Sequence, residues 1–219
     1  MKYHIVSTSR TGHGAIFTNL KEAGDYIKAH PGSTYSVFDQ IPGQIPPVKI
    51  IADKTRAEPK SNSSKIIIFT DGSALGNPGP GGYGVVMIKH GNTLELSQGY
   101  KYTTNNRMEM MAVITALEEI EPTDQPIKIF SDSQYTINGI TKGWAKNWRK
   151  KGWKKSNNKP ALNIDLWSRL LDLLERFPGV SFHWVKGHAG DPLNERADAL
   201  ATGAARENCC QLEDTGYKP

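Results

Sequence analysis

Hydrophobic and polar residues follow two different patterns along the chain, and the change between them falls near residue 65. The first 50 residues hold short apolar runs at 3–6, 15–17 and 34–38, which predict strands, with a helix over 19–28 between the last two. So short a unit buries little surface, so its own core is expected to be small.

From residue 65 onward, apolar runs typical of strands alternate with runs of helical spacing. Met108, Met111 and Leu117 recur at helical intervals before Pro122, which ends that pattern. The expected strands cover 65–71, 83–90, 93–100, 127–132 and 180–185, the expected helices 105–120, 133–140, 164–177 and the residues after Asp191-Pro192, and a Gly- and Pro-rich turn covers 72–82. Three strands followed by alternating helices and strands predict a mixed sheet with helices packed on it, the α/β class.

The two patterns are separated by residues 51–64, which hold almost no bulky apolar side chain and are typical of a linker. We therefore expect a small α/β domain over 1–50, a larger domain over 65–205 and a C-terminal tail over 206–219.

Composition narrows the class of protein. With 37% hydrophobic and 22% charged residues the chain is too apolar to be disordered, and a mean hydropathy of −0.51 is too polar for a membrane protein. No apolar run approaches the roughly 18 residues of a membrane span, and the first residues lack an apolar signal core. The two cysteines, Cys209 and Cys210, are adjacent and cannot cross-link distant segments. We expect a cytoplasmic protein without membrane association.

The formal net charge of +5 is weak evidence for a polyanionic partner, but the positive charge is concentrated in one segment. Residues 133–164 hold no acidic residue and eight basic ones, Lys142, Lys146, Arg149, Lys150, Lys151, Lys154, Lys155 and Lys159. Such a block, with acidic clusters elsewhere, favours a protein that binds phosphate groups and carries out metal chemistry nearby.

Four carboxylates lie where strand ends and helices meet in folds of this class. Asp71 and Asp132 end strands, and Glu109 and Asp198 lie in helices. Because such elements converge at one edge of the sheet, the four side chains can meet there. Clustered carboxylates repel one another and so favour a hard divalent cation such as Mg²⁺. Two such ions about 4 Å apart can activate a water and stabilise the leaving oxygen in phosphodiester hydrolysis.

The alternative is that each acid has an ordinary role. Asp71 and Asp132 would be turn or cap residues, Glu109 would face solvent, and Asp198 would form an ion pair. The spacing of the acids alone favours this alternative. The residues around each acid favour a metal site instead.

The residues around the acids resemble the motifs of type 1 ribonuclease H, in that family's order. The motifs are TDGS at 70–73 with GNPGPGGYG at 76–84, TTNNRME at 103–109, SDSQY at 131–135, WVKGHAG at 184–190 and NERADALA at 194–201. The resemblance covers about two thirds of the chain. It implies a ribonuclease H-like, five-stranded mixed sheet flanked by helices, and an endonuclease that hydrolyses the RNA strand of RNA/DNA hybrids.

Carried over by position, the resemblance assigns Asp71, Glu109, Asp132 and Asp198 as catalytic acids that bind two Mg²⁺ ions, with Mn²⁺ as a substitute. His188, on a glycine-flanked loop, matches the family's catalytic histidine. An imidazole of near-neutral pKa can carry a proton to or from the leaving group.

The resemblance also implies substrate contacts. Asn77, Asn105 and Gln134 match residues along the minor groove, where amides suit base edges and the 2′-hydroxyl that distinguishes RNA from DNA. Thr104 and Asn163 match residues that hold a phosphate of the DNA strand. The full implied set is Asn77, Thr104, Asn105, Asn106, Gln134, Trp144, Lys146, Trp148 and Asn163.

The basic block resembles the family's basic protrusion. Trp144 and Trp148 are one helical turn apart and, with Lys146 between them, can face a sugar–phosphate backbone. The alternative is that these tryptophans pack the protrusion onto the domain while the lysines are merely solvated.

The sequence departs from the family pattern at several positions. Tyr102 stands where many members have Arg, which weakens the expected phosphate site. Residues 3–38 look like the hybrid-binding domain that precedes many type 1 enzymes, but Leu20 replaces an expected Trp, and Ser36 and Val37 replace expected lysines. We expect the small domain to keep its fold and to bind hybrid weakly or not at all.

These observations predict a monomeric endonuclease that leaves 3′-hydroxyl and 5′-phosphate ends. Two other function classes stay open. A DNA-cutting nuclease on the same fold is disfavoured by Asn77, Asn105 and Gln134, and a nucleic-acid-binding protein without catalysis is disfavoured by the complete set of acids with His188. Activity on a single ribonucleotide in DNA is left open by the sequence.

Overall fold

The structure, a computed structural model, describes the larger part of the chain. It gives the backbone of Tyr3–Ser7, Gly14–Phe17, Thr34–Phe38 and Val48–Ile50, and backbone and side chains of residues 65–89, 91–187, 189–207 and 211–218. The helix expected over 19–28, the linker 51–64, His188 and the two cysteines lie outside the described residues.

The strands and helices follow the order that the hydrophobic pattern predicts, with β4 (Val48–Ile50) and α4 (Trp144–Lys150) as additional elements that it did not predict. The strands are β1 Tyr3–Ser7, β2 Gly14–Phe17, β3 Thr34–Phe38, β4 Val48–Ile50, β5 Ile66–Ala74, β6 Gly79–Lys89, β7 Asn92–Thr103, β8 Ile127–Ser131 and β9 Val180–Trp184. The helices are α2 Asn105–Glu118, α3 Gln134–Thr141, α4 Trp144–Lys150, α5 Ile164–Glu175 and α6 Pro192–Arg206. No described helix is both long and apolar enough to cross a membrane.

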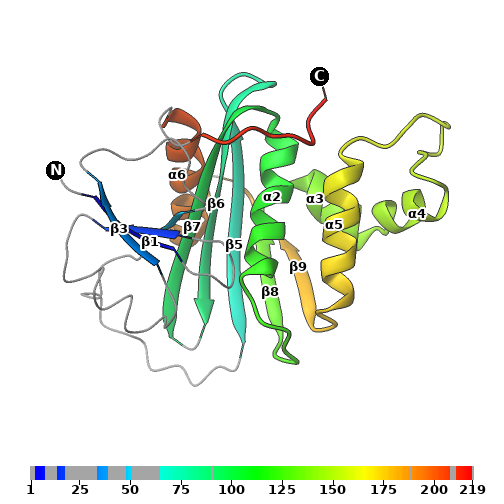
Figure 1. Cartoon of the computed structure of the whole chain (residues 1–219). Coiled ribbons are helices and arrows are strands. Elements are labelled where there is room, and N and C mark those ends of the chain that lie inside the picture. Colours follow the sequence, from blue (N-terminus) through cyan, green and yellow to red (C-terminus); the bar gives the residue numbers. More distant parts are fainter. Residues whose placement is uncertain are drawn as a thin grey trace.

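Strands β5 to β9 form the five-stranded mixed sheet that the sequence predicts (Figure 1). β5, β6 and β7 pair antiparallel, whereas β8 runs parallel to both β5 and β9. The spatial order is β7-β6-β5-β8-β9, so β5 is central and β9 is an edge strand. At the other edge the backbone of β4 pairs with β7, and β1, β2 and β3 continue the sheet beyond it.

Helices cover both faces of this sheet. α2 packs on β5 and β6, with α5 beside it, and α6 packs on the opposite face over β5, β6 and β7 (Figure 1). Alternate residues of β5 serve the two faces: Ile66 and Ile68 join the core under α2 and α5, and Phe69 joins the smaller cluster under α6 with Ala197. The side-chain alternation of β5 therefore fixes which face each residue serves.

Two expected boundaries are wrong in an informative way. β5 continues past the expected end at residue 71 to Ala74, and β6 begins at Gly79, so most of the expected turn 72–82 is a strand pair. The glycines are needed for close packing here. A Cβ at Gly84 would overlap the backbone oxygen of Ala197, and one at Gly82 would crowd the backbone of Ala201, so α6 can lie directly on β6.

Helix starts follow local chemistry. Ser133 caps α3 by accepting a hydrogen bond from the backbone N–H of Thr136 at 3.2 Å. Asp191 caps α6, accepting from the backbone N–H of Leu193 at 3.0 Å, and Pro192 occupies the first turn of that helix. The predicted starts of both helices are confirmed.

Candidate active site

Three of the four predicted acids meet beside the C-terminal half of β5, the end of β8 and the first turns of α2. Asp71, Glu109 and Asp132 each bring one carboxylate oxygen to within 4.8 Å of the other two. Asp71 and Glu109 are almost fully buried, at 7% and 6% exposure, and Asp132 is partly buried. Asp71 and Asp132 come together because β5 and β8 are parallel neighbours, and Glu109 reaches them because α2 packs on β5.

A glycine on each side of the cluster permits this approach. A Cβ at Gly72 would overlap the backbone of Met108 and Glu109, so the absence of a side chain lets α2 lie directly against β5. A Cβ at Gly187 would overlap Oδ2 of Asp132. Glycine therefore supplies the close approach on which the distance between the acids depends.

The electrostatics of the cluster favour a cation. Burial, followed by the charges of Asp132 and then Asp198, raises the pKa of Asp71 to about 7, although the backbone N–H of Gly72 donates to it at 2.7 Å and lowers the pKa. Burial, with the charges of Asp71 and Asp132, holds the pKa of Glu109 well above its usual range. At neutral pH and without a metal ion, the fold therefore keeps these carboxyl groups close together although their negative charges repel one another.

The donor set fits a hard divalent ion. Oε2 of Glu109 is buried and has no hydrogen-bond partner among the described residues, a costly arrangement unless an ion or water fills the site. Its other oxygen is 3.5 Å from Nδ2 of Asn105, a long contact. Carboxylate oxygens that converge in this way are the ligands that Mg²⁺ and Mn²⁺ accept in proteins.

The fourth acid, Asp198, does not belong to this close group. It lies in α6, partly buried, and its Oδ1 accepts a hydrogen bond from Oγ1 of Thr202 at 3.3 Å. Its negative charge is the smallest of the effects that raise the pKa of Asp71. His188 lies outside the described residues, between Gly187 and Ala189.

The asparagines of the expected minor-groove set form one hydrogen-bonded unit beside the acids. Oδ1 of Asn77 accepts from the backbone N–H of Asn105 at 3.1 Å, and Oδ1 of Asn105 accepts from the backbone N–H of Ala74 at 3.1 Å. The loop after β5 is thereby tied to the first residue of α2. Asn106 and Gln134 are exposed and lie at the starts of α2 and α3.

The two residues expected at a phosphate each precede a helix. Thr104 lies at the cap position of α2, but its hydroxyl makes no capping hydrogen bond, and Asn163 precedes α5 with φ of 57°. Arg107 joins the two helix starts, since it donates to both oxygens of Asp165 at 2.9 and 2.7 Å. Thr104 and Asn163 therefore directly precede two helices, α2 and α5, whose starts are joined by the buried guanidinium of Arg107.

The two tryptophans of the basic block have different environments. Trp148 packs edge-on against Trp167, with ring centroids 6.0 Å apart, and contributes to the core. Trp144 is 37% exposed, and Nζ of Lys142 lies 5.5 Å from its ring centroid. The alternative of tryptophan packing is thus correct for Trp148, whereas Trp144 remains available at the surface.

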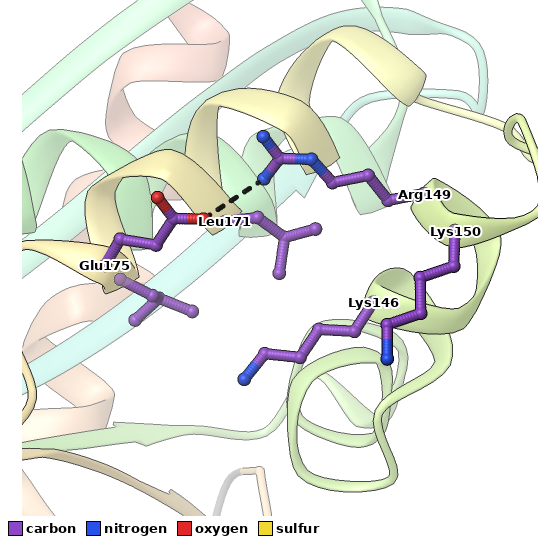
Figure 2. A pocket seen from close by; sticks show the side chains of 6 residues that line it. Lys146, Arg149, Lys150, Leu171 and Glu175 are labelled. Atoms are coloured by element: carbon purple, nitrogen blue, oxygen red, sulfur yellow. Dashed lines mark ion pairs between the residues drawn. The ribbon is translucent and has the colours of Figure 1, made fainter.

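The basic side chains also divide. Arg149 forms ion pairs with Asp172 at 2.8 Å and Glu175 at 3.5 Å, so its charge is committed to α5. Figure 2 shows Arg149 reaching Glu175 beside Leu171, while Lys146 and Lys150 extend along the open side of the pocket between α4 and α5. All three side chains are exposed, but Arg149 is already paired with acids of α5, so Lys146 and Lys150 are the better candidates to meet a phosphate backbone.

Sequence reasoning missed two features of this region. Arg107 and Asp214 form a buried ion pair, and Trp184 is half exposed beside the acids, with its indole N–H donating to the backbone oxygen of Asp132 at 3.1 Å. Arg107 and Trp184 both stand inside the quoted motifs, but no local pattern in the sequence gives the partner of either.

A buried carboxylate cluster at the strand ends of a mixed sheet defines a cation-binding site of the acidic type. A model of the RNase H family matches residues 63–206, more than half of the chain. Ribonuclease H of Desulforamulus reducens is 54% identical over 147 residues, 67% of this chain and 91% of that protein. The chain therefore belongs to the RNase H family.

Two solved structures are similar in fold. LC9-RNase H1, described as a type 1 RNase H with the type 2 active-site motif, has a TM-score of 0.57 and 28% identity, covering 72% of this chain and 81% of that one. LC11-RNase H1 in complex with an RNA/DNA hybrid has a TM-score of 0.50 and 32% identity, covering 64% and 96%. These likenesses support the type 1 kind of RNase H.

Proposed function

We propose that this chain is an endonuclease that hydrolyses the RNA strand of RNA/DNA hybrids by a two-metal-ion mechanism, giving 3′-hydroxyl and 5′-phosphate ends. The observation that carries the proposal is the buried convergence of Asp71, Glu109 and Asp132 in a chain of the RNase H family. The hybrid bound by LC11-RNase H1 supports the choice of substrate.

Asp71, Glu109 and Asp132 would hold the ions, with Asp198 completing the set from α6. The ions, Mg²⁺ with Mn²⁺ as a substitute, supply positive charge that lowers the pKa of an attacking water and offsets charge on the leaving oxygen. The burial of Asp71 and Glu109 strengthens this role, since charges interact more strongly away from water. His188 would carry a proton to or from the leaving oxygen.

The amides beside the acids would select RNA. Asn77, Asn105 and Gln134 offer both donors and acceptors, which suits the 2′-hydroxyl and the base edges of the minor groove without demanding one base. The hydrogen bonds among Asn77, Asn105 and Ala74 fix two of these amides in place before substrate binds, which lowers the ordering cost of binding.

The DNA strand would be held by phosphate contacts. Thr104 and Asn163 would bind one phosphate, and Trp144 and Lys146 of the protrusion would follow the backbone further along. The exposed ring of Trp144 and the exposed ammonium of Lys146 support direct contact. Trp148, packed on Trp167, supports the protrusion from beneath.

For the remainder of the protein, we propose that residues 1–50 form a small domain of the hybrid-binding kind, followed by the linker 51–64, the catalytic domain 65–205 and the tail 206–219. Leu20, Ser36 and Val37 would weaken its binding of hybrid. The enzyme would act as a monomer in the cytoplasm. Comparing KM with and without residues 1–50 tests the contribution of that segment.

A cleavage assay tests the proposed function. The full chain is incubated with Mg²⁺ and an end-labelled hybrid, duplex DNA or duplex RNA, and Asp132→Asn serves as the inactive control. We expect cuts in the RNA strand of the hybrid alone, with none in the control. Equal cleavage of duplex DNA would show a general nuclease, and binding of hybrid without any Mg²⁺-dependent turnover would show a protein that only binds.

A further inference from the structure

A pocket of about 340 Å³ lies between helix α3 and the end of strand β9. Its residues are Gln134, Ile137, Asn138, Lys142 and Trp184. Among these, only Gln134 belongs to the set expected to bind substrate. This volume lies within the range of ligand sites in proteins, which begins at about 300 Å³.

The pocket is connected directly to the acidic cluster. The indole Nε1 of Trp184 donates to the backbone oxygen of Asp132 at 3.1 Å, which fixes the ring next to a residue of the cluster. Gln134, on the other wall, follows Asp132 by two residues. A group bound in this pocket would therefore be an immediate neighbour of the reacting phosphate.

The order of strands places the pocket on a defined side of the cluster. Asn77 follows β5, Asp71 lies on β5, Asp132 follows β8, and Trp184 ends β9, the edge strand beyond β8. A nucleic-acid strand that lies along this sheet edge thus meets the asparagines on one side of the acids and the Trp184 pocket on the other.

The chemistry of the lining suits one sugar–phosphate unit. Gln134 and Asn138 of α3 and Lys142, which follows its last residue, are spaced four residues apart, a rise of about 6 Å each along one face of the helix. Two amide side chains and a lysine line the pocket together with Trp184, which is 50% exposed, and no carboxylate is among the described lining residues. The Lys142 ammonium lies 5.5 Å from the ring centroid of Trp144, at the border between the pocket and the protrusion. An aromatic face packs on a ribose, amides pair with hydroxyls, and an ammonium pairs with a phosphate.

We infer that this pocket is a subsite for a ribonucleotide of the cleaved strand, next to the scissile phosphate on the side away from Asn77. Trp184 packs on the sugar, Asn138 and Gln134 bind its hydroxyl groups, and Lys142 binds the phosphate. The inference rests on the proposed function, since it names how that same site holds its RNA strand.

Steady-state cleavage of hybrids with Mg²⁺ tests the subsite, using Trp184→Ala, Trp184→Phe and Lys142→Gln. The RNA strand is shortened one nucleotide at a time from each end. For the parent enzyme KM falls when the strand grows long enough to fill the subsite. Trp184→Ala raises KM about tenfold, in the range of one lost aromatic contact with a nucleotide, and changes kcat less than about twofold. In this variant KM does not fall when the RNA strand reaches the length that fills the subsite; we call this fall in KM the length step. Lys142→Gln also raises KM, whereas Lys101→Gln, an exposed lysine on β7, does not.

Trp184→Phe separates the subsite from a structural role. Phe keeps a ring face but cannot donate to Asp132, so the subsite predicts a KM near that of the parent enzyme. A loss of kcat in both variants with KM and the length step unchanged would overturn the inference, since the ring would then only support Asp132. If the parent enzyme cuts no hybrid, the proposed function fails; if it cuts and Trp184→Ala behaves like the parent, only the subsite fails.

Discussion

Both carboxylate oxygens of Asp214 accept hydrogen bonds from Arg107, Oδ2 from Nε at 2.6 Å and Oδ1 from Nη2 at 2.7 Å. Oδ2 also accepts from Oγ1 of Thr103 at 2.6 Å. The segment 211–218 is thereby attached to the first turn of α2, two residues before Glu109. The same guanidinium holds Asp165 at the start of α5, so one buried cation joins three segments distant in sequence.

Replacing Asp214 tests this connection. The side chains of Arg107 and Asp214 are 3% and 8% exposed, so Asp214→Ala leaves a buried charge with half of its partners. We expect the free energy of unfolding to fall by about 3 kcal/mol, the usual loss when one partner of a buried pair is removed. The neighbouring Glu213, 66% exposed and paired with Lys101, is the matched control, with an expected loss below about 1 kcal/mol. Similar losses for both variants in urea unfolding would contradict the buried role of Asp214.

The same network predicts an acid dependence of stability. Hydrogen bonds from Arg107 hold the pKa of Asp165 below its usual value, against the opposing effect of burial. A lowered pKa contributes stability above the ordinary carboxyl pKa, and this contribution is lost as the pH falls through the folded-state pKa. Asp165→Asn should therefore flatten the loss of stability below about pH 4, measured by urea unfolding at fixed ionic strength. If Asp165→Asn lost as much unfolding free energy below about pH 4 as the parent protein, the pairing of Asp165 with Arg107 would be contradicted.

The metal-free acidic cluster predicts the opposite pH dependence. Because the pKa of Asp71 is raised to about 7, its contribution to stability is complete below the ordinary carboxyl pKa and is lost as the pH rises toward 7. At pH 8 without divalent ions, Asp71→Asn should raise Tm by about 5 °C while abolishing cleavage. Mg²⁺ should raise the Tm of the parent protein and change that of the variant less. The control Asp172→Asn removes an exposed acid paired with Arg149 and should show the parent's response to pH and to Mg²⁺.

The contact between β5 and α2 predicts a sharp effect of one methyl group. In Gly72→Ala the new Cβ would overlap the backbone of Glu109, so α2 must move. We expect a loss of about 1–3 kcal/mol in stability and at least a tenfold loss of kcat, since Glu109 moves with the helix. At Gly203, in α6, a Cβ would meet nothing within 4 Å, and Gly203→Ala should stabilise the protein by up to about 1 kcal/mol. Normal kcat in Gly72→Ala would show that the close approach is dispensable.

The basic protrusion predicts a change in salt dependence. Each lysine that binds a phosphate should contribute about 0.9 to the slope of log affinity against log salt. In the Asp132→Asn background, Lys150→Gln, Lys151→Gln and Lys154→Gln together should lower the slope by about 1 to 3. The matched control replaces Lys65, Lys89 and Lys101 by Gln, which changes the net charge equally. Equal slopes for both triple variants would show that only net charge matters.

Local patterns were sufficient for the order and type of most elements after residue 65, with α4 as the exception. The spacing of Met108, Met111 and Leu117 predicts α2, and the pair Asp191-Pro192 predicts the start of α6, because these signals depend on residues close in sequence. The extension of β5 to Ala74 and the start of β6 at Gly79 were not predictable in this way. There the glycines serve contacts with α2 and α6 that are remote in sequence.

The amino-acid sequence by itself determined the helices and strands after residue 65 except α4, the four acids that are candidate metal ligands, and the concentration of positive charge in residues 133–164. The tertiary structure alone decided that Asp71, Glu109 and Asp132 form the close group while Asp198 lies outside it. It also decided that Trp148 is packed inside while Trp144 and Trp184 face solvent. The physical reason is that periodicity and capping act within a few residues, whereas the distance between two carboxylates depends on how closely separate elements pack.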